Sequence, residues 1–269
     1  MKGKKIAALL MAAVLLMAAM TGCSGSGDKG TLKVATNAEF DPWEYLENGE
    51  FVGADMDIIR AVADKMGMKV EIQNMEFEAV LSALVSKSCD VAVAGLTVNK
   101  KRAEQVDFSS AYYKVSQMLI VRNDDTVFTG TTKEELDEQL KGKKIGVCTG
   151  YTGQQYVEGD PDWPFEPIEN AQAVIYDNIS LAIQGLKDKA VDVVMMDDAV
   201  AKQAAAADQN KDAVRIIDVK LTDERYAIGV QKGNTELMEK VNKALEELRS
   251  EGEIAKILAK YDMEEPADL

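Results

Sequence analysis

The chain has 269 residues, of which 31 are basic and 46 are acidic, and its formal net charge of −15 at pH 7 excludes nucleic acid as a partner. It contains no histidine, which removes the commonest general base and the commonest metal ligand, so no metal or other cofactor is expected. The length left after a leader is removed fits one large domain or two of ordinary size.

The start of the chain is typical of an exported protein. Three lysines precede an apolar run over residues 6–20 that is too short and too rich in alanine to be a good membrane-spanning helix. Residues 20–23 resemble a bacterial lipobox, so residues 1–22 are predicted to be a lipoprotein signal peptide and Cys23 the lipidated first residue. Residues 23–30 would be the polar tether of the anchored domain. An ordinary secreted protein cut elsewhere is the alternative.

The first strand of the mature chain is expected at residues 31–36, and a loop carrying Asn37, Phe40 and Trp43 follows it. Loops at the carboxyl ends of strands are where open α/β sheets bind ligands. This placement makes Asn37 and Phe40 candidates for ligand contact, whereas Trp43 is expected in the core or at the rim. Residues 45–52 predict a small hairpin.

An amphipathic helix is expected next, because apolar residues recur at helical spacing. Asp55 and Asp57 are interpreted as its capping carboxylates rather than as ligand contacts. A strand at 69–72, Phe77 and a second helix at 79–85 complete this part of the chain.

Three signals converge in the stretch after that helix. Residues 91–94 are apolar and partly β-branched, as in a buried strand, and Gly95 ends them. Thr97 follows, and Arg102 lies in a short helix at 100–105. A guanidinium beside a hydroxyl, free backbone N–H groups and a helix N-terminus favour binding of a carboxylate. A solvated arginine on a surface helix is the alternative.

The middle of the chain predicts further alternating elements. A strand is expected at 117–121, a helix with an N-terminal capping box at 132–140, and a strand at 144–147. The small, hydroxyl-rich turn at 149–153 enters another helix and is a second candidate anion site.

Two segments of the chain resemble each other. Residues 84–95 align without gaps on residues 186–197, and in each an amphipathic helix leads into an apolar strand that ends at a polar turn. The pattern predicts two lobes built on one plan. The chance likeness of any two helix-then-strand units is the alternative.

The end of the chain returns to the first lobe. A helix is expected at 199–207, strands at 215–221 and 226–230, and two helices close the chain, the last at 253–260. The predicted organisation has four parts: lobe 1 at 31–112 and 226–269, lobe 2 at 117–221, and hinge crossings at 113–116 and 222–225.

Two cysteines besides Cys23 lie beside or within predicted apolar strands, Cys89 and Cys148. We expect buried free thiols, although a disulfide between them is possible. No second apolar run is long enough to cross a bilayer.

Five segments follow one another in an order that is typical of one family: Ala35-Thr36-Asn37 through Pro42, Gly53-Ala54-Asp55-Met56-Asp57, Ala94 to Arg102, Asp107-Phe108-Ser109 with Tyr112-Tyr113, and Gly150-Tyr151-Thr152. In these segments, residues 30 to 262 resemble a family 3 extracellular solute-binding protein, the amino-acid receptor of an ABC importer, in the group that includes glutamine- and histidine-binding proteins. The resemblance implies a two-lobed α/β fold of the type II periplasmic-binding-protein class. Each lobe would have a mostly parallel sheet flanked by helices, with two hinge crossings between the lobes.

The resemblance also implies roles for individual residues. The α-carboxylate of a bound amino acid would be held by four groups: Arg102, Thr97, the backbone of Gly95, and Thr152. Asp197 would hold the α-ammonium. Tyr151 stands where threonine or serine is frequent in the family, and this departure affects the geometry expected around the carboxylate.

The ligand's side chain would meet four residues: Asn37, Phe40, Phe77 and Cys148. The two aromatic residues match positions that sandwich it. Asn37 stands where relatives often have an aspartate, and Cys148 where glutamine receptors have a lysine. A neutral polar side chain is therefore the first expectation, although Glu39 could favour a cationic one.

The implied mechanism is closure of the two lobes around the ligand, followed by recognition of the closed form by a membrane permease. The protein is expected to be a monomer on the outer face of the cytoplasmic membrane or in the periplasm, held by its lipid anchor. A periplasmic dehydratase on the same fold is an alternative, and its acid or base would be Glu39, Asp197 or a lysine. The sensor domain of a signalling receptor is another.

Overall fold

The computed structural model describes residues 30–161, 163 and 165–269. The predicted signal peptide at 1–22, the lipidation site Cys23 and the tether up to residue 29 lie outside these described residues. Thr31–Leu269 form one compact unit, and the fold below is that of this unit.

The first sheet has the strand order β5-β1-β6-β15-β7. Three neighbouring strands run parallel, β5 (Lys69–Asn74), β1 (Thr31–Thr36) and β6 (Val91–Ala92). Two antiparallel strands extend it, β15 (Gly229–Gln231) and β7 (Val106–Phe108). The helices around this sheet are α2 (Ala54–Lys65), α3 (Phe77–Val85), α4 (Lys100–Gln105), α9 (Thr235–Ser250) and α10 (Glu253–Ala259).

The second sheet repeats this plan, with the order β11-β10-β12-β9-β13. Its parallel strands are β11 (Gln172–Tyr176), β10 (Lys144–Cys148) and β12 (Val193–Asp197). Its antiparallel strands are β9 (Gln117–Arg122) and β13 (Val214–Ile217). Its helices are α5 (Lys133–Leu140), α6 (Thr152–Glu158), α7 (Ile179–Lys187) and α8 (Asp198–Ala206). The structure therefore has the two-sheet α/β architecture expected from the sequence.

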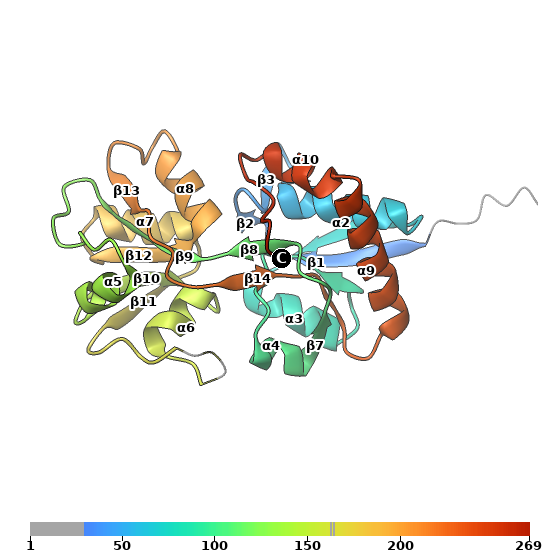
Figure 1. Cartoon of the computed structure of the whole chain (residues 1–269), viewed down its shortest axis with the longest axis horizontal. Coiled ribbons are helices and arrows are strands. Elements are labelled where there is room, and N and C mark those ends of the chain that lie inside the picture. Colours follow the sequence, from blue (N-terminus) through green and yellow to red (C-terminus); the bar gives the residue numbers. More distant parts are fainter. Residues whose placement is uncertain (1–29, 162, 164) are drawn as a thin grey trace, which may run out of the picture. The chain divides into compact units, whose positions relative to one another are not determined.

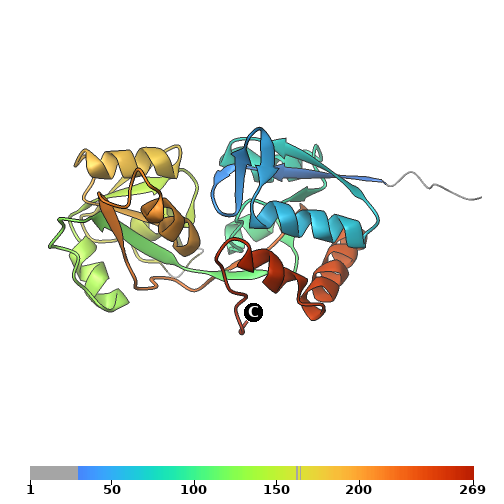
Figure 2. The same ribbon diagram turned by 90° about the horizontal axis from the view of Figure 1, so that it is seen from above.

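Two strands carry the chain between the sheets. β8 (Tyr113–Val115) leads from the first sheet into β9, and β14 (Glu224–Tyr226) leads back toward β15. They pair with each other in antiparallel fashion, so the two passages lie side by side (Figures 1 and 2). A pair of adjacent connections of this kind can act as a hinge.

A small third sheet lies next to β1 in the sequence, formed by β2 (Glu39–Phe40), β3 (Glu44–Glu47) and β4 (Glu50–Val52). The hairpin between β3 and β4 turns at Asn48 and Gly49, whose positive φ angles of 52° and 85° suit a tight two-residue turn. The predicted hairpin is thus confirmed. Phe40, however, lies in a paired strand rather than in the loop expected from the sequence.

Several element boundaries differ from those expected. The single strand expected at 226–230 is two strands, β14 and β15, because the chain leaves the crossing pair before it joins the first sheet. The strand expected at 91–94 pairs only at Val91–Ala92. β7 and β11 had no counterpart among the expected strands, while α4 begins and ends where expected.

The two similar segments, called here the first repeat (residues 84–95) and the second repeat (residues 186–197), have the same local geometry. Lys87 directly follows the C-cap residue of α3, and Lys189 directly follows that of α7. Both lysines have a positive φ angle, 61° for Lys87 and 60° for Lys189. Asp90 Oδ2 accepts a hydrogen bond from the Lys33 backbone N–H at 2.8 Å, and Asp192 Oδ2 accepts one from Lys144 N–H at 2.8 Å. Each repeat thus fixes its strand to the neighbouring parallel strand in the same way.

The core contains the residues expected to be buried. Trp43 is fully buried and packs on Tyr113 and Tyr226, with ring centroids 4.6 and 5.1 Å away, so it belongs to the core and not to a ligand contact. Cys89 and Cys148 are both buried and free, as expected. A search of residues 30–161, 163 and 165–269 for a helix with the length and hydropathy of a bilayer span returns none.

Candidate functional site

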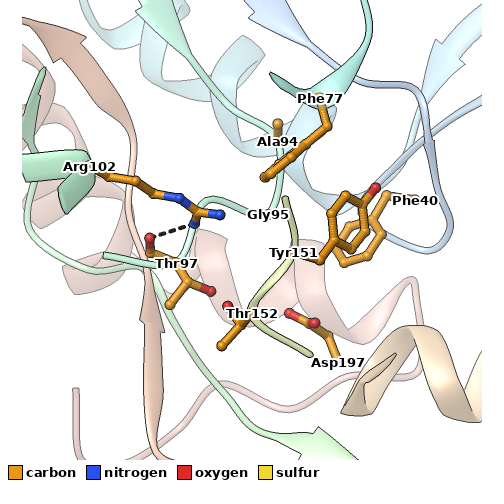
Figure 3. Close-up of a pocket in the computed structure, with 9 residues that line it drawn as sticks. All are labelled: Phe40, Phe77, Ala94, Gly95, Thr97, Arg102, Tyr151, Thr152 and Asp197. Atoms are coloured by element: carbon orange, nitrogen blue, oxygen red, sulfur yellow. Dashed lines mark hydrogen bonds between the residues drawn. The ribbon is translucent and has the colours of Figure 1, made fainter. Parts of the chain in front are cut away.

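A small pocket lies between residues of the two sheets, and Figure 3 shows its lining. Nine residues form it: Phe40, Phe77, Ala94, Gly95, Thr97, Arg102, Tyr151, Thr152 and Asp197. Seven of them are residues singled out from the sequence for ligand contact. The pocket lies where strands β6 and β12 end, which is the edge at which open α/β sheets bind ligands.

Arg102 provides the positive charge of the pocket. Asn99 caps α4 by accepting a hydrogen bond from the Arg102 backbone N–H at 2.7 Å, which fixes the first turn that carries the side chain. The guanidinium donates to the Thr97 carbonyl oxygen at 2.8 Å and to the Gly150 carbonyl oxygen at 3.1 Å. Its side chain is buried, and burial lowers the pKa of Arg102. The alternative of a solvated surface arginine is therefore wrong.

The backbone of Gly95 does not offer its N–H to the pocket, contrary to the role implied by the family resemblance. The Gly95 N–H donates to Asp55 Oδ2 at 2.8 Å, and Tyr112 donates its hydroxyl to Asp55 Oδ1 at 2.7 Å. Asp55 is fully buried. The N-cap of α2 is Gly53, with no side-chain hydrogen bond at the cap, so the interpretation of Asp55 and Asp57 as capping carboxylates is also wrong. Burial raises the pKa of Asp55 to about 6.

Glu224 is a functional candidate that sequence reasoning missed. It lies on the crossing strand β14 and is 1% exposed. Thr97 donates its hydroxyl to Glu224 Oε2 at 2.9 Å, and Thr222 donates its hydroxyl to Oε1. Burial raises the pKa of Glu224, while hydrogen bonds from these hydroxyls and from Thr152 act to lower it. The pocket thus has a second buried carboxylate directly behind its threonines.

Asp197 provides the negative charge that faces the pocket. It is the last residue of β12, and it accepts hydrogen bonds from Gln117 Nε2 at 2.7 Å and from the Tyr226 hydroxyl. Burial, followed by the nearby charge of Glu224, raises the pKa of Asp197 to about 7. A cation next to Asp197 would stabilise its ionised form.

Three aromatic rings form the remaining wall. Tyr151 packs edge-on against Phe40 at a centroid distance of 5.3 Å and against Phe77 at 4.6 Å. The Arg102 guanidinium carbon lies 5.3 Å from the centroid of Phe77. Figure 3 shows the Tyr151 ring in front of Phe40, with Phe77 on its other side.

Two residues expected to contact the ligand's side chain are not among those that line the pocket. Asn37 donates its amide to the Met75 carbonyl oxygen at 3.0 Å and accepts from the Tyr151 hydroxyl at 3.3 Å, so Tyr151 lies between it and the pocket. Cys148 is buried in the core, and this burial raises its pKa to about 12. Glu39 is exposed and lines a separate surface pocket with Asp41.

The charges of the pocket suit a small ligand that itself carries a positive and a negative group. Among residues 30–161, 163 and 165–269, no three histidine, cysteine, aspartate or glutamate side chains are grouped so that they could hold a metal ion. A buried guanidinium and a buried carboxylate in one pocket suit a ligand that carries both charges.

Comparison with known proteins identifies the family. The model of the bacterial extracellular solute-binding proteins, family 3, matches residues 32–264. The chain belongs to this family. The arginine-binding extracellular protein ArtP of Bacillus subtilis (strain 168) is 30% identical over 259 residues, which cover 94% of this chain and 96% of that protein. A probable histidine-binding protein of Neisseria gonorrhoeae is 31% identical, covering 96% and 95%.

Solved structures agree with the family assignment. An ancestral arginine-binding protein bound to arginine has 38% sequence identity and a TM-score of 0.76, covering 87% of this chain and 99% of its own. The same kind of protein bound to glutamine has 39% identity and a TM-score of 0.74, covering 87% and 98%. The type II periplasmic-binding-protein fold expected from the sequence is thus confirmed. Neither the family nor these relatives are described as dehydratases or signalling receptors.

Membership of the family also bears on location. The family is one of extracellular solute-binding proteins, so an extracytoplasmic place of action agrees with the export signal expected from the sequence.

Proposed function

We propose that this solute-binding protein captures a free amino acid with a polar side chain and delivers it, unchanged, to the permease of an ABC importer. The observation that carries the proposal is the pair Arg102 and Asp197, two buried side chains of opposite charge in one pocket. Arg102 comes from α4 beside the first sheet and Asp197 from the end of β12 in the second. A free amino acid presents a carboxylate and an ammonium group on one carbon, which such a pair complements. The named relatives, which bind arginine or histidine, support this ligand class.

The proposed contacts follow from the charges. Arg102 would bind the ligand's carboxylate and Asp197 its ammonium group. Thr97 and Thr152 could donate to the carboxylate once their hydroxyl groups turn away from Glu224. Phe40 would contact the side chain.

The affinity expected from these contacts is in the micromolar range. Hydrogen bonds to charged groups contribute about 1.5–3 kcal/mol each. Four or five of them at the upper end of this range, less a cost of about 4 kcal/mol or more for immobilising the ligand, suffice for about −8 kcal/mol, which corresponds to a Kd of about 1 μM.

The crossing strands suggest how binding is signalled. In our proposal lobe 1 comprises residues 31–112 and 226–269, lobe 2 comprises 117–221, and the hinge lies at 113–116 and 222–225. A ligand that contacts Arg102 in one lobe and Asp197 in the other would stabilise the closed arrangement, which the permease would recognise.

The place of action is also part of the proposal. We propose a monomer held at the outer face of the cytoplasmic membrane, or in the periplasm, by a lipid on Cys23. Mass spectrometry of the protein should find the lipid on Cys23, and Cys23→Ser should move the protein from the membrane fraction to the soluble fraction. Retention of the variant in the membrane fraction would contradict the anchor.

The function itself is tested by a thermal-shift screen of the common amino acids with the full chain. A ligand present at a hundred times its Kd should add about 2.7 kcal/mol to the free energy of unfolding. Recovery of the amino acid unchanged would support a receptor, whereas its chemical conversion would contradict the proposal. A screen in which no amino acid raises Tm would do the same.

A further inference from the structure

Gly150 and Tyr151, two consecutive residues on the side of the second sheet, contact side chains that line the pocket. They lie in the turn between β10 and α6, where Tyr151 is the N-cap residue of the helix. Gly150 places its carbonyl oxygen 3.1 Å from Arg102 Nη2. Tyr151 places its ring against Phe40 and Phe77 and is only 9% exposed.

These contacts are made with the same protein groups that, in the proposed function, bind the ligand. Arg102 is the proposed partner of the carboxylate, and its two terminal nitrogens already donate to the carbonyl oxygens of Thr97 and Gly150. The two phenylalanine rings are the expected contacts of the ligand's side chain, and the Tyr151 ring already packs on both. The Tyr151 hydroxyl also reaches Asn37, the residue expected to contact that side chain.

The space that remains is too small for any amino acid. The free volume of the pocket is about 10 Å³, which is about enough for one water molecule. An amino acid therefore enters when the two lobes of the proposed function separate. After closure it takes the place of the Gly150 carbonyl group at Arg102 and, when its side chain is long, also that of the Tyr151 ring.

We infer that Gly150-Tyr151 is an internal surrogate ligand, and that Tyr151 determines specificity by occupying the side-chain compartment. This inference rests on the proposed function. Every amino acid has to displace the Gly150 carbonyl group from Arg102. Only a ligand with a long side chain also has to displace the Tyr151 ring from between Phe40 and Phe77, so the site discriminates against long side chains in favour of short ones.

The decisive variant is Tyr151→Thr, with Tyr151→Phe as the matched control that keeps the ring and removes only the hydroxyl. Calorimetry with alanine, serine, glutamine and arginine should show that Tyr151→Thr improves the affinity for arginine and glutamine at least tenfold relative to alanine. Tyr151→Phe should keep the wild-type ratio within threefold. An unchanged ratio in Tyr151→Thr, or a larger loss for arginine than for alanine, would show that the ring is a wall that contacts the ligand and would overturn the inference.

A measurement on the wild-type chain keeps the inference testable if Tyr151→Thr does not fold. Hydroxyl-radical footprinting read by mass spectrometry should find Tyr151 protected without ligand and at least threefold more reactive when the protein is saturated with arginine. Saturation with alanine should leave it protected. Protection that is unchanged by arginine would overturn the displacement of the ring.

The outcomes separate this inference from the proposed function. Binding that depends on Arg102 but has a side-chain preference independent of Tyr151 would overturn only the surrogate ligand. Binding of arginine by Tyr151→Thr but not by the wild type would support it. Absence of amino-acid binding in both proteins would overturn the proposed function and the inference together.

Discussion

In both repeats a helix is followed by a lysine in the left-handed backbone conformation and by an aspartate that accepts a backbone N–H from the neighbouring strand. The two repeats nevertheless present opposite charges to the pocket. The difference begins where their strands end. The first repeat ends at Gly95, and the chain then runs on to α4, whose first turn carries Arg102. The second repeat ends at Asp197, and α8 begins at the next residue. One scaffold thus presents a cation or an anion according to the residues at and beyond the end of its strand.

Removing the positive charge of Arg102 should have the largest effect on ligand affinity. Arg102→Ala should weaken amino-acid binding about a hundredfold, because it removes two charge-assisted hydrogen bonds that together contribute about 3 kcal/mol. Calorimetry measures the affinity, and circular dichroism checks the fold. The neighbouring exposed Lys101→Ala is the control and should bind as the wild type does. Equal affinities for all three proteins would remove Arg102 from the site.

Removing the negative charge of Asp197 should weaken ligand binding somewhat less. Asp197→Asn keeps the shape of the side chain and one oxygen, which can accept from either Gln117 or Tyr226, whereas in the wild type each of them donates to its own carboxylate oxygen. The variant also removes the charge that faces the ammonium group. Affinity should fall about thirtyfold, as expected for one interaction of about 2 kcal/mol. The exposed Asp188→Asn, at the end of α7, is the control. A variant that binds as tightly as the wild type would assign the ammonium group to another residue, such as the buried Glu224, which shares the Gln117 amide with Asp197.

Protonation of the Asp197 carboxylate at low pH should remove its negative charge reversibly. The pKa of Asp197 is raised to about 7 in the ligand-free protein, and the ligand's ammonium group binds the ionised form better, so binding should lower that pKa. Affinity should therefore fall about tenfold between pH 8 and pH 6, because Asp197 is mostly ionised at the first pH and mostly protonated at the second. Calorimetry across this range should give a smaller slope for Asp197→Asn. An equal slope in both proteins would assign the titration to another group.

The smallest expected effect is on stability, and it should be the same for the equivalent aspartates of the two repeats. Asp90→Ala and Asp192→Ala each remove a partly exposed carboxylate that accepts a backbone N–H from the adjacent strand, so each should lower the free energy of unfolding by about 1 kcal/mol. Urea denaturation measures the change. Neither variant should alter ligand affinity more than about twofold. A clear difference between the two would show that the repeats do not contribute equally to stability.

Much of the candidate site could be predicted because its residues lie near the ends of regular elements. The apolar strands before Gly95 and Asp197 and the capping of α4 by Asn99 are local patterns, and they place Arg102 and Asp197 at the same edge of their sheets. The hydroxyl-rich turn at 149–153 already indicated an anion site that includes Thr152, and the family resemblance added its role toward a carboxylate. The positions of these residues can be predicted from the general plan of the fold, without knowledge of contacts between residues far apart in the sequence.

The parts that could not be predicted depend on pairs that are far apart in the sequence. Gly95 gives its N–H to Asp55, 40 residues away, and Thr97 gives its hydroxyl to Glu224, 127 residues away. No periodicity connects such residues. Glu224 had one usable signal, because it stands two residues before Tyr226 and alternate residues of a strand share a face. Asn37 does not line the pocket in this structure because Tyr151 covers it.

The position of Trp43 has a consequence for how the protein can be observed. Its ring packs on Tyr113 of β8 and on Tyr226 of β14, which are the two crossing strands. The chain has only one other tryptophan, Trp163, which stacks on Phe165 in the part of the chain that belongs to the second sheet. In a Trp163→Phe variant the remaining emission would come from a fluorophore packed on both strands of the proposed hinge. It would be an internal optical probe of the lobe closure that we propose.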